Sequence, residues 1–409
     1  MRKILIVGAG QAGLQLANGL AQHDYDVTVV SNRTPEQIHD GKVTSSQCMF
    51  DEALRPERDL GLNFWDDDCP PVEGLSFSVP APDGSGGKAI YFQSRLDGPA
   101  QSVDQRVKMP RWMEELERRG GRIEIHDATA ADLDRYAAEY DLVVIAAGKG
   151  DITGIFERDA ERSTYDKPMR ALALTYVRGM TPRPEFSAVN FNLIPGVGEY
   201  FVFPALTTTG DCEIMVFEGV PGGPMDCWGD VSTPEQHLQR SLEILEKFIP
   251  WEAERNRTVE LTDDNGVLAG RFPPTVRKPV AQLAGGGLAL GLADVVVLND
   301  PITGQGSNNA SKCAAVYLQR ILERGGQPFD RQWMEETFER YWDYAQYVAT
   351  WTNALLGPPP EHVLKILGAA GRHQPIAKRF VEGFNDPRDF FEWFMTPDKA
   401  EAYLAEVAA

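Results

Sequence analysis

Three glycines near the start of the chain have the spacing of a phosphate-binding turn. Gly8, Gly10 and Gly13 form a G-x-G-x-x-G run that also includes Gln11 and Ala12. The first glycine permits a tight turn, the second lets the backbone approach a phosphate, and the third lets a helix pack closely on the preceding strand. These five residues are therefore the predicted binding site for the pyrophosphate of a dinucleotide, at the N-terminus of a helix.

The elements needed to position this turn are present on both sides of it. Residues 3–7 form a short apolar run, an apolar stripe continues to about Ala21, and residues 27–30 form a second apolar run. The order strand, turn, helix, strand is that of a nucleotide-binding βαβ unit. The same pattern also fits a glycine turn that binds no ligand and serves only to let the helix pack on the strand.

The residues after the second strand do not identify the dinucleotide. The acid expected there for the adenosine ribose is absent, and Ser31, Asn32 and Arg33 take its place. Ser31 and Asn32 are predicted to hydrogen-bond a ribose. Arg33 either pairs with a 2′-phosphate, which would indicate NADP, or is a solvated surface arginine.

A second glycine turn, far along the chain, favours FAD. It contains Gly304, Gln305, Gly306, Ser307 and Asn308 and precedes an apolar-striped helix. Two such turns on one sheet suit a ligand as long as FAD, with this turn against the isoalloxazine. A helix that begins here directs free N–H groups and a positive dipole end outward, where they would stabilise the negative charge of reduced flavin. Asp294, at the end of the preceding strand, is predicted to bind ribityl hydroxyls or else to cap a turn.

The composition indicates a globular protein of two or three lobes, with 409 residues of which 43% are hydrophobic. A formal net charge of -20 disfavours nucleic acid and anionic membranes as partners, because both would be repelled. A strand predicted from residue 3 argues against a signal peptide, and no segment stays apolar long enough to span a bilayer, so we expect a cytoplasmic protein. The cysteines and histidines lack metal-binding spacing, so no metal site is predicted.

The pattern along the chain predicts an α/β fold. Segments at 103–118, 122–125 and 141–148 extend the first βαβ unit into one parallel sheet. Extended runs at 171–177, 188–193, 200–204 and 213–218 predict an inserted antiparallel sheet, closed by a helix over 234–248. The predicted domains are a Rossmann-like FAD-binding domain in two parts (1–165 and 281–325), a β-rich substrate domain (166–280) and a helical C-terminal region (326–409).

Two stretches need separate interpretation. Residues 78–88 are rich in proline and glycine, which predicts a flexible hairpin tip or a mobile loop. The C-terminal region is rich in tryptophan, tyrosine and phenylalanine. We expect these aromatic side chains to form packing contacts rather than a cofactor site.

Several motifs together resemble a known family. The first glycine turn, Asp294 and the run Asp300-Pro301-x-x-Gly304-Gln305-Gly306-x-Asn308 resemble the FAD-dependent aromatic monooxygenases. Three further segments are similar to the oxygenase component of styrene and indole monooxygenases, namely Gln22-His23-Asp24, Val103-Asp104-x-Arg106 and Val143-Val144 through Gly148-Lys149. The resemblance covers nearly the whole chain. It implies that Arg106 and Pro301 belong to the flavin site.

The resemblance also implies a two-component enzyme. The larger hydroxylase family carries an Asp-Gly pair that handles both FAD and NAD(P)H, whereas the matching strand here ends in Ala147-Gly148. The missing acid suggests that this chain does not reduce its own flavin, and the resembling family receives reduced FAD from a separate NADH:flavin reductase. Reduced FAD and O2 would give a flavin C4a-hydroperoxide, whose distal oxygen epoxidises an electron-rich double bond.

One segment matches the indole branch of this family. That branch has serine, glutamine and methionine at alternate positions after the first βαβ unit, as in Ser45, Gln47 and Met49, whereas the styrene branch has asparagine, valine and histidine. The expected product is the indole 2,3-epoxide, which leads to indigo. The predicted substrate site consists of Ser45, Gln47, Met49, Val72, Leu75, Ala100, Phe201 and Phe203. The predicted catalytic residues are Ser45, Ser46, Gln47 and Pro301, none of them a general base.

Other interpretations remain open. The same chemistry would serve styrene epoxidation or sulfoxidation of aryl sulfides, because an apolar pocket discriminates poorly between flat aromatics. An NADP-dependent reductase that uses Arg33 and a non-catalytic protein that stores or senses reduced FAD are the alternatives outside this chemistry. The resemblance further suggests a homodimer.

Overall fold

The computed structural model describes residues 1–147 and 151–408, and its first βαβ unit forms where the sequence predicts it. β1 (Lys3–Val7), α1 (Gln11–Ala21) and β2 (Asp26–Ser31) follow one another, and β1 pairs with β2 in parallel. Gly8 has a φ of +118°, and a Cβ on Gly13 would lie 2.1 Å from the carbonyl oxygen of Gly8. Both the turn and the close helix packing therefore require glycine.

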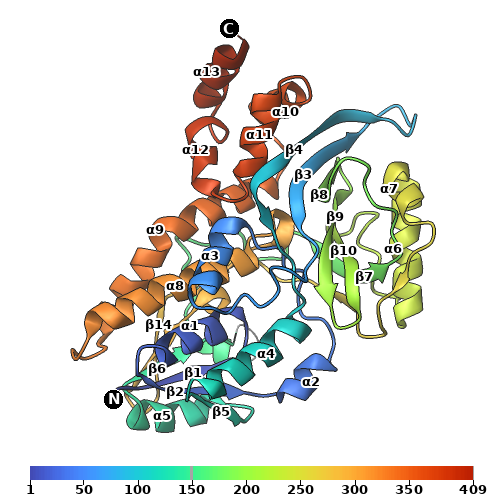
Figure 1. Cartoon of the computed structure of the whole chain (residues 1–409). Coiled ribbons are helices and arrows are strands. Elements are labelled where there is room, and N and C mark those ends of the chain that lie inside the picture. Colours follow the sequence, from blue (N-terminus) through green and yellow to red (C-terminus); the bar gives the residue numbers. More distant parts are fainter. Residues whose placement is uncertain (148–150, 409) are drawn as a thin grey trace.

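Within the described residues, the first sheet has six strands in the order β14-β15-β6-β1-β2-β5. Its other strands are β5 (Arg122–Ile125), β6 (Leu142–Ile145), β14 (Val280–Gln282) and β15 (Leu288–Gly291). Its pairs are parallel apart from β14 with β15. α4 (Gln105–Arg118) and α8 (Gly306–Arg324) pack against α1, and α5 (Ala130–Glu139) lies on the opposite face of the sheet (Figure 1). The predicted parallel sheet is thus confirmed.

The second sheet is larger and mainly antiparallel. Its strand order is β11-β7-β10-β9-β8-β3-β4, with β12 beside β7. The bounds are β3 (Val72–Pro80), β4 (Lys88–Ala100), β7 (Ala171–Arg178), β8 (Ala188–Ile194), β9 (Gly198–Thr207), β10 (Gly210–Gly219), β11 (Glu260–Leu261) and β12 (Val267–Gly270). The four extended runs predicted between residues 171 and 218 correspond to β7, β8, β9 and β10, which confirms the antiparallel sheet.

Two strands of this sheet come from the range 1–165, which the sequence had suggested for the FAD domain alone. β3 pairs with β4 antiparallel and with β8 parallel, so this range contributes to both sheets. The alternation of apolar and polar residues does not identify β3, because both faces of this strand are buried. Ser76 and Ser78 are as buried as their apolar neighbours. Ser76 donates a hydrogen bond to Asn190 of β8 at 2.8 Å, which satisfies the buried hydroxyl. Residues 81–87 connect β3 to β4 as a hairpin.

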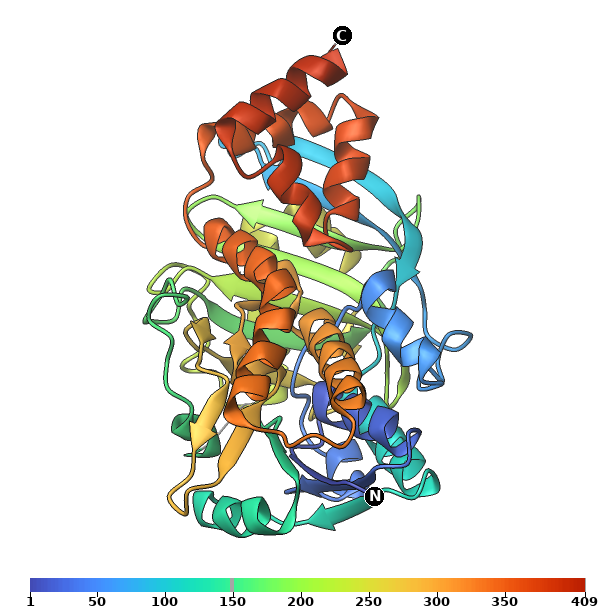
Figure 2. The same cartoon turned by 90° about the vertical axis from the view of Figure 1, so that its left-hand side faces the viewer.

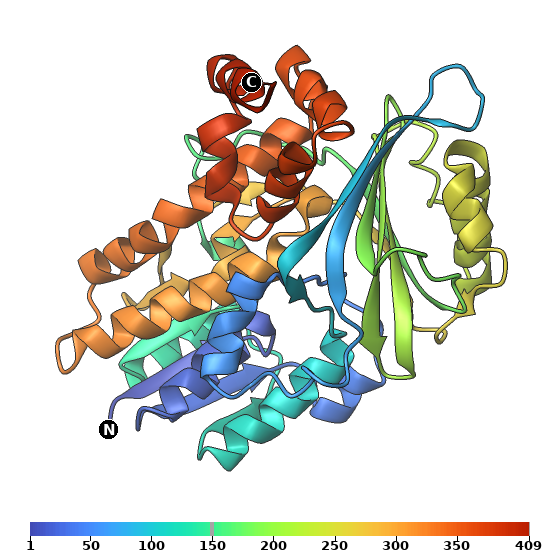
Figure 3. The same ribbon diagram turned by 45° about the horizontal axis from the view of Figure 1, so that its top comes forward.

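Helices cover both faces of the second sheet. α6 (Pro234–Phe248), with the predicted bounds, and α7 (Pro250–Arg255) pack on one face. The C-terminal region lies against the other face, where α10 and α11 contact β4 (Figures 2 and 3). Its helices are α9 (Arg331–Leu355), α10 (Glu361–Ala370), α11 (Gln374–Glu382), α12 (Phe390–Trp393) and α13 (Pro397–Ala408).

The aromatic side chains of the C-terminal region form a core. Trp351, Phe390 and Trp393 have no exposed surface, and Trp351 stacks on Phe390 with ring centroids 4.6 Å apart. The predicted packing role is confirmed. In the part of the chain that the structure describes, no helix combines the length and the apolar character needed to cross a membrane.

Candidate active site

The glycine turn after β1 can receive an anionic group. α1 begins directly after Gly10 and has no side-chain hydrogen bond at its N-terminus, so its first N–H groups need a partner. A Cβ on Gly10 would meet no atom within 4 Å, which leaves the turn open on that side. These two features fit a pyrophosphate at the helix N-terminus.

The side chain of Gln11 is directed into the protein, away from the predicted phosphate. Its amide nitrogen donates to Glu57 of α3 (Asp51–Asp59) at 2.8 Å, and its amide oxygen accepts from Lys108 of α4 at 3.3 Å. Only the backbone of Gln11 and of the buried Ala12 therefore remains for a ligand.

A buried ion pair lies beneath this turn. Lys108 Nζ is 2.7 Å from Glu57 Oε1, and the two side chains are 2% and 0% exposed. The pair joins α3 and α4 directly under the N-terminus of α1. The sequence analysis missed it, because a lysine between Val107 and Met109 on a helix gives no sign of burial.

The second turn lies close to the first. α8 also begins without a side-chain cap, after Gln305. Gln15 of α1 donates to the carbonyl oxygen of Ser311 at 3.0 Å, so the N-terminal parts of α1 and α8 lie side by side. Cβ atoms on Gly304 and Gly306 would meet nothing within 4 Å. Two neighbouring uncapped helix N-termini beside open glycine turns fit FAD, with the phosphates at α1 and the ring at α8.

The carboxyl ends of the parallel strands bring further predicted residues to this edge of the first sheet. β15 runs parallel to β6 and β1, and the exposed Asp294 follows it. At the end of β2, Ser31 Oγ donates to the carbonyl oxygen of Arg33 at 2.7 Å and so closes its own turn. Asn32 is exposed and Arg33 is half-buried. Gly148, at which the sequence predicts another glycine turn, lies outside the described residues.

Asn308 and Gln305 use their side chains within the protein. Asn308 donates to the carbonyl oxygen of Cys48 and accepts from the N–H of Phe50, both at 2.8 Å. Gln305 donates to the carbonyl oxygen of Phe384 at 2.9 Å. Asn308 thereby fixes the segment that contains Ser45 to Met49 against the start of α8, next to the turn at Pro301.

Arg106, predicted at the flavin, has a structural role instead. Its guanidinium is 3% exposed and lies 2.9 Å from the carboxylates of both Asp104 and Asp263. A further nitrogen donates to the hydroxyl of Thr207 at 3.0 Å. Both carboxylates help to raise the pKa of Arg106, although burial, the largest influence, opposes them. The side chain joins α4 to β9 and to the loop around Asp263, and its donors are engaged there.

Ser45 and Gln47 are held together by a tyrosine that the sequence analysis missed. Ser45 Oγ donates to Gln47 Oε1 at 2.8 Å, and Tyr176 Oη donates to the carbonyl oxygen of Ser45 at 2.9 Å. The amide of Gln47 donates to Tyr176 Oη at 3.4 Å. Burial raises the pKa of Tyr176 well above its ordinary value, so it remains a donor. Ser46, between them, is half-buried.

Met49 points away from this group, which corrects its predicted contact with the substrate. It packs with Ala53 and Leu54 in a small separate cluster, and its sulfur accepts from Lys108 Nζ at 3.4 Å. Its two neighbours in the chain, Cys48 and Phe50, belong instead to the core of the second sheet.

The apolar residues predicted at the substrate share one core with the Pro301 turn. Val72, Leu75, Ala100, Phe201 and Phe203 are all buried in the cluster that includes Ile302. Val72 lies opposite Ala100 in the β3–β4 register. The position of Phe201 and Phe203, left open by the sequence, is now clear, because both face the C-terminal helices and not α6.

Phenylalanines form a stacked row across this face. The row runs through Phe92, Phe77, Phe191, Phe201 and Phe203, with successive centroids 5.3–6.4 Å apart. A cavity of about 90 Å³ separates part of this row from α9, α10 and α11 and includes Ile302 in its wall. It is therefore an apolar space that adjoins the second turn.

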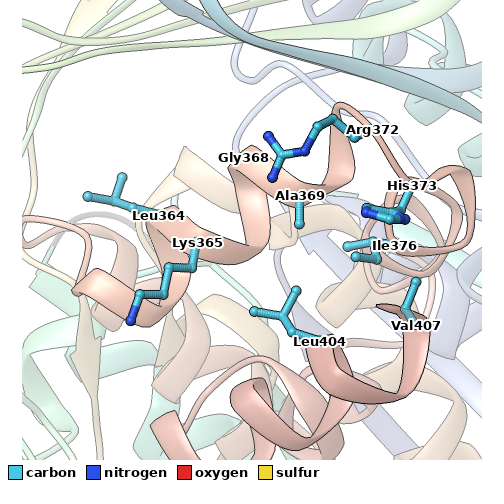
Figure 4. A pocket seen from close by; sticks show the side chains of 9 residues that line it. All are labelled: Leu364, Lys365, Gly368, Ala369, Arg372, His373, Ile376, Leu404 and Val407. Atoms are coloured by element: carbon cyan, nitrogen blue, oxygen red, sulfur yellow. The ribbon is translucent and has the colours of Figure 1, made fainter. Parts of the chain in front are cut away.

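A larger hollow has a different location. It lies among α10, α11 and α13 at the outer end of the C-terminal region, and its wall includes Lys365, Arg372 and His373 (Figure 4). It contains none of the predicted site residues. Its size alone does not make it the reaction site.

The sequence is similar to styrene monooxygenases along its whole length. A family model described as "Styrene monooxygenase A putative substrate binding domain" matches residues 148–255. Styrene monooxygenase StyA of Pseudomonas fluorescens is 31% identical over 417 aligned residues, which cover 100% of this chain and 98% of that protein.

Solved structures of flavin enzymes share the fold. A flavoprotein/dehydrogenase from Cytophaga hutchinsonii superposes with a TM-score of 0.64 at 12% identity, over 93% of this chain and 92% of that one. A triple mutant of the flavin-dependent brominase Bmp2 gives 0.61 at 14% identity, over 94% and 92%. Because the StyA identity extends over the full length, the chain belongs to the styrene monooxygenase family, as the oxygenase component of a two-component FAD-dependent monooxygenase that uses reduced FAD and O2.

Proposed function

We propose that this oxygenase epoxidises the C2=C3 bond of indole, with products that lead to indigo. The observation that carries the proposal is the hydrogen-bonded group of Ser45, Gln47 and Tyr176 beside an otherwise apolar wall. Gln47 Oε1 accepts one hydrogen bond, from Ser45, and an amide oxygen has a second lone pair. That lone pair would accept the indole N–H, which styrene lacks.

In this proposal the residues of the chain hold the flavin and the substrate in place and take no part in proton transfer. Reduced FAD, when bound, supplies the electrons that activate O2. The backbones at Gly8–Gly13 and Gly304–Ser307 and the carboxylate of Asp294 would hold it, with Pro301 against the ring. Val72, Leu75, Ala100, Phe201 and Phe203 would exclude water and keep the flat substrate near the ring.

Styrene epoxidation is the second candidate, and the names of the curated relatives favour it. The apolar wall would accept either molecule, since one added polar atom changes binding in such a pocket only modestly. The two functions differ in the use of Gln47, which only indole requires.

A competition between the two alkenes tests the assignment. We expect the wild-type protein, supplied with reduced FAD, to turn over indole preferentially, and Gln47→Leu to lower kcat/KM for indole about tenfold more than for styrene, as the loss of one hydrogen bond predicts. Styrene serves as the internal control, because damage to the fold would reduce both activities. A strong wild-type preference for styrene, or an equal loss for both alkenes, would overturn the indole assignment.

We also propose that a separate NADH:flavin reductase delivers the reduced FAD through a transient contact. The observation in support is that the chain leaves β6 through Ala146 and Ala147, with no acid at either position. We expect no bleaching of bound FAD by NADH or NADPH until a reductase is added. Bleaching by NADPH alone would contradict this and favour a role for Arg33. The homodimer remains a prediction, which sedimentation velocity would test.

A further inference from the structure

Four buried charged residues meet where the second sheet joins the flavin turn. They are Arg170, Glu199, Glu218 and Asp300, and none is more than 5% exposed. Glu199 of β9 and Glu218 of β10 lie opposite each other in the strand register. Alternation places both on the face of Val216 and Phe201, the face that contacts Ile302. Asp300 directly precedes the 3₁₀ turn Pro301–Thr303.

Only one of the three carboxyl groups has its charge balanced by direct contact. Arg170 binds Glu199 with two hydrogen bonds of 2.6 and 2.9 Å, and its remaining nitrogen donates to the carbonyl oxygens of Met169 and Leu356. Asp300 Oδ1 accepts from the N–H of Ile302 at 3.1 Å. Among the described residues, Asp300 Oδ2 and both oxygens of Glu218 have no hydrogen-bond donor.

The side chains of Glu218 and Asp300 lie within hydrogen-bonding reach of each other, and two buried carboxylates in that position cannot both remain ionised. The cost of burying an unpaired charge far exceeds the cost of holding one proton. Burial, followed by the charges of Asp300 and Glu199, raises the pKa of Glu218 well above its ordinary value. Burial also raises the pKa of Asp300. A pair of this kind shares a proton, as one carboxylic acid and one carboxylate.

We propose that Glu218 retains a proton and donates it in a hydrogen bond to Asp300 Oδ2, so that Glu218 is a positioning residue for the turn Asp300–Gly304. The bond gives a partner to Asp300 Oδ2 and to one of the two oxygens of Glu218. It joins β10, which pairs with the strand that carries Phe201 and Phe203, to the turn that receives the flavin ring. In this last respect the inference rests on the proposed function.

The other ionisable groups around Glu218 agree with this assignment. Glu199 faces it from β9, and Arg170 lies at the start of β7. His362 of α10 lines the same cavity as Glu199, and its buried Nε2 has no partner among the described residues. The single cation among these groups, Arg170, is already engaged with Glu199. The acid–carboxylate pair therefore leaves one net charge near the turn, on Asp300.

Infrared spectroscopy of the protein without flavin tests the proton directly. At pH 8 the wild-type protein should show the C=O stretching band of a protonated carboxyl group, and Glu218→Gln should lose it. Glu213→Gln is the matched control, because Glu213 lies on the same strand, alternates to the opposite face and has a pKa of about 7. The control should retain the band. A spectrum that Glu218→Gln leaves unchanged would overturn the shared proton.

Flavin binding tests the positioning role. Glu218→Gln keeps a donor for Asp300 and should bind FAD within about twofold of wild type. Glu218→Leu leaves Asp300 unpaired and should bind at least tenfold more weakly, and the added change Asp300→Asn should restore most of that loss. Wild-type affinity in Glu218→Leu would refute the role. Failure of the wild-type protein to bind FAD would instead refute the proposed function, while the infrared result would stand.

Discussion

The ion pair of Lys108 and Glu57 gives the strongest quantitative prediction. Lys108→Met removes the cation but keeps the length and much of the apolar stem of the side chain. Glu57 would then be a buried carboxylate whose remaining contact is the amide of Gln11. Removing one partner of a buried pair costs about 3–5 kcal/mol, because the other charge is left without compensation.

This loss should appear in the thermal midpoint. With an unfolding entropy of roughly 2.1 cal/mol/K per residue, a cooperative unit of 409 residues would lose about 3–6 °C in Tm. The double change Lys108→Met and Glu57→Leu removes both charges, and we expect it to recover most of the loss, since apolar replacements of a buried pair are close to neutral. Differential scanning calorimetry of the three proteins at pH 7.5 measures these shifts.

A control variant tests whether the loss of Tm depends on the burial of the ion pair. Lys365→Met breaks an exposed pair with Glu361 at 2.9 Å and should leave Tm unchanged. The reasoning is refuted if Lys108→Met matches wild type, or if the double variant is less stable than the single one. FAD titration of the folded Lys108→Met protein adds a functional measure, because the side chain of Gln11, at the start of α1, would lose one of its three hydrogen-bond partners.

Four other substitutions have distinct expected results. Gly10→Ala should keep the wild-type Tm but weaken FAD binding, because its Cβ enters the open space at the turn, whereas Gly13→Ala should lower Tm, because its Cβ would lie 2.1 Å from a backbone oxygen. Calorimetry and flavin fluorescence titration measure the two effects. Equal effects of the two substitutions on Tm and on FAD binding would contradict the separate roles of these glycines. Arg106→Met should lower Tm and leave FAD affinity of the folded protein near wild type, and a selective loss of FAD binding would restore its predicted cofactor role. Burial lowers the pKa of His237 to about 4, below its unfolded value of 6.5, so the unfolded state binds more protons and stability should fall as pH drops from 6.5 towards 4. Urea titrations should show a smaller fall in His237→Phe, and an identical pH dependence would exclude His237 as the cause.

Local sequence was sufficient for the features that depend on near neighbours. The G-x-G-x-x-G turn involves six consecutive residues, and its glycine requirement follows from backbone sterics. Thr233, Pro234 and Glu235 begin α6 where predicted, because a helix cap is a contact over three residues. The same holds for β7 to β10, whose apolar runs are separated by glycine and proline turns.

Only the tertiary structure decided which distant residues meet. Tyr176 binds Ser45 across 131 positions, and Asn308 binds Cys48 across 260. No periodicity encodes such a contact, since it depends on how the sheets and α8 pack together. The same limit explains why Arg106 and Met49 were expected at ligands, although each finds its partners inside the protein.

The chain's sequence by itself thus determined the two glycine turns, the class of each sheet and the family resemblance. The tertiary structure decided that β3 and β4 join the second sheet, that Lys108 and Glu57 lie under α1, and that Glu218 meets Asp300. The physical reason is the range of the interactions. Backbone sterics and hydrogen bonds between near neighbours act over a few residues, whereas burial and charge compensation depend on segments that only the complete fold brings together.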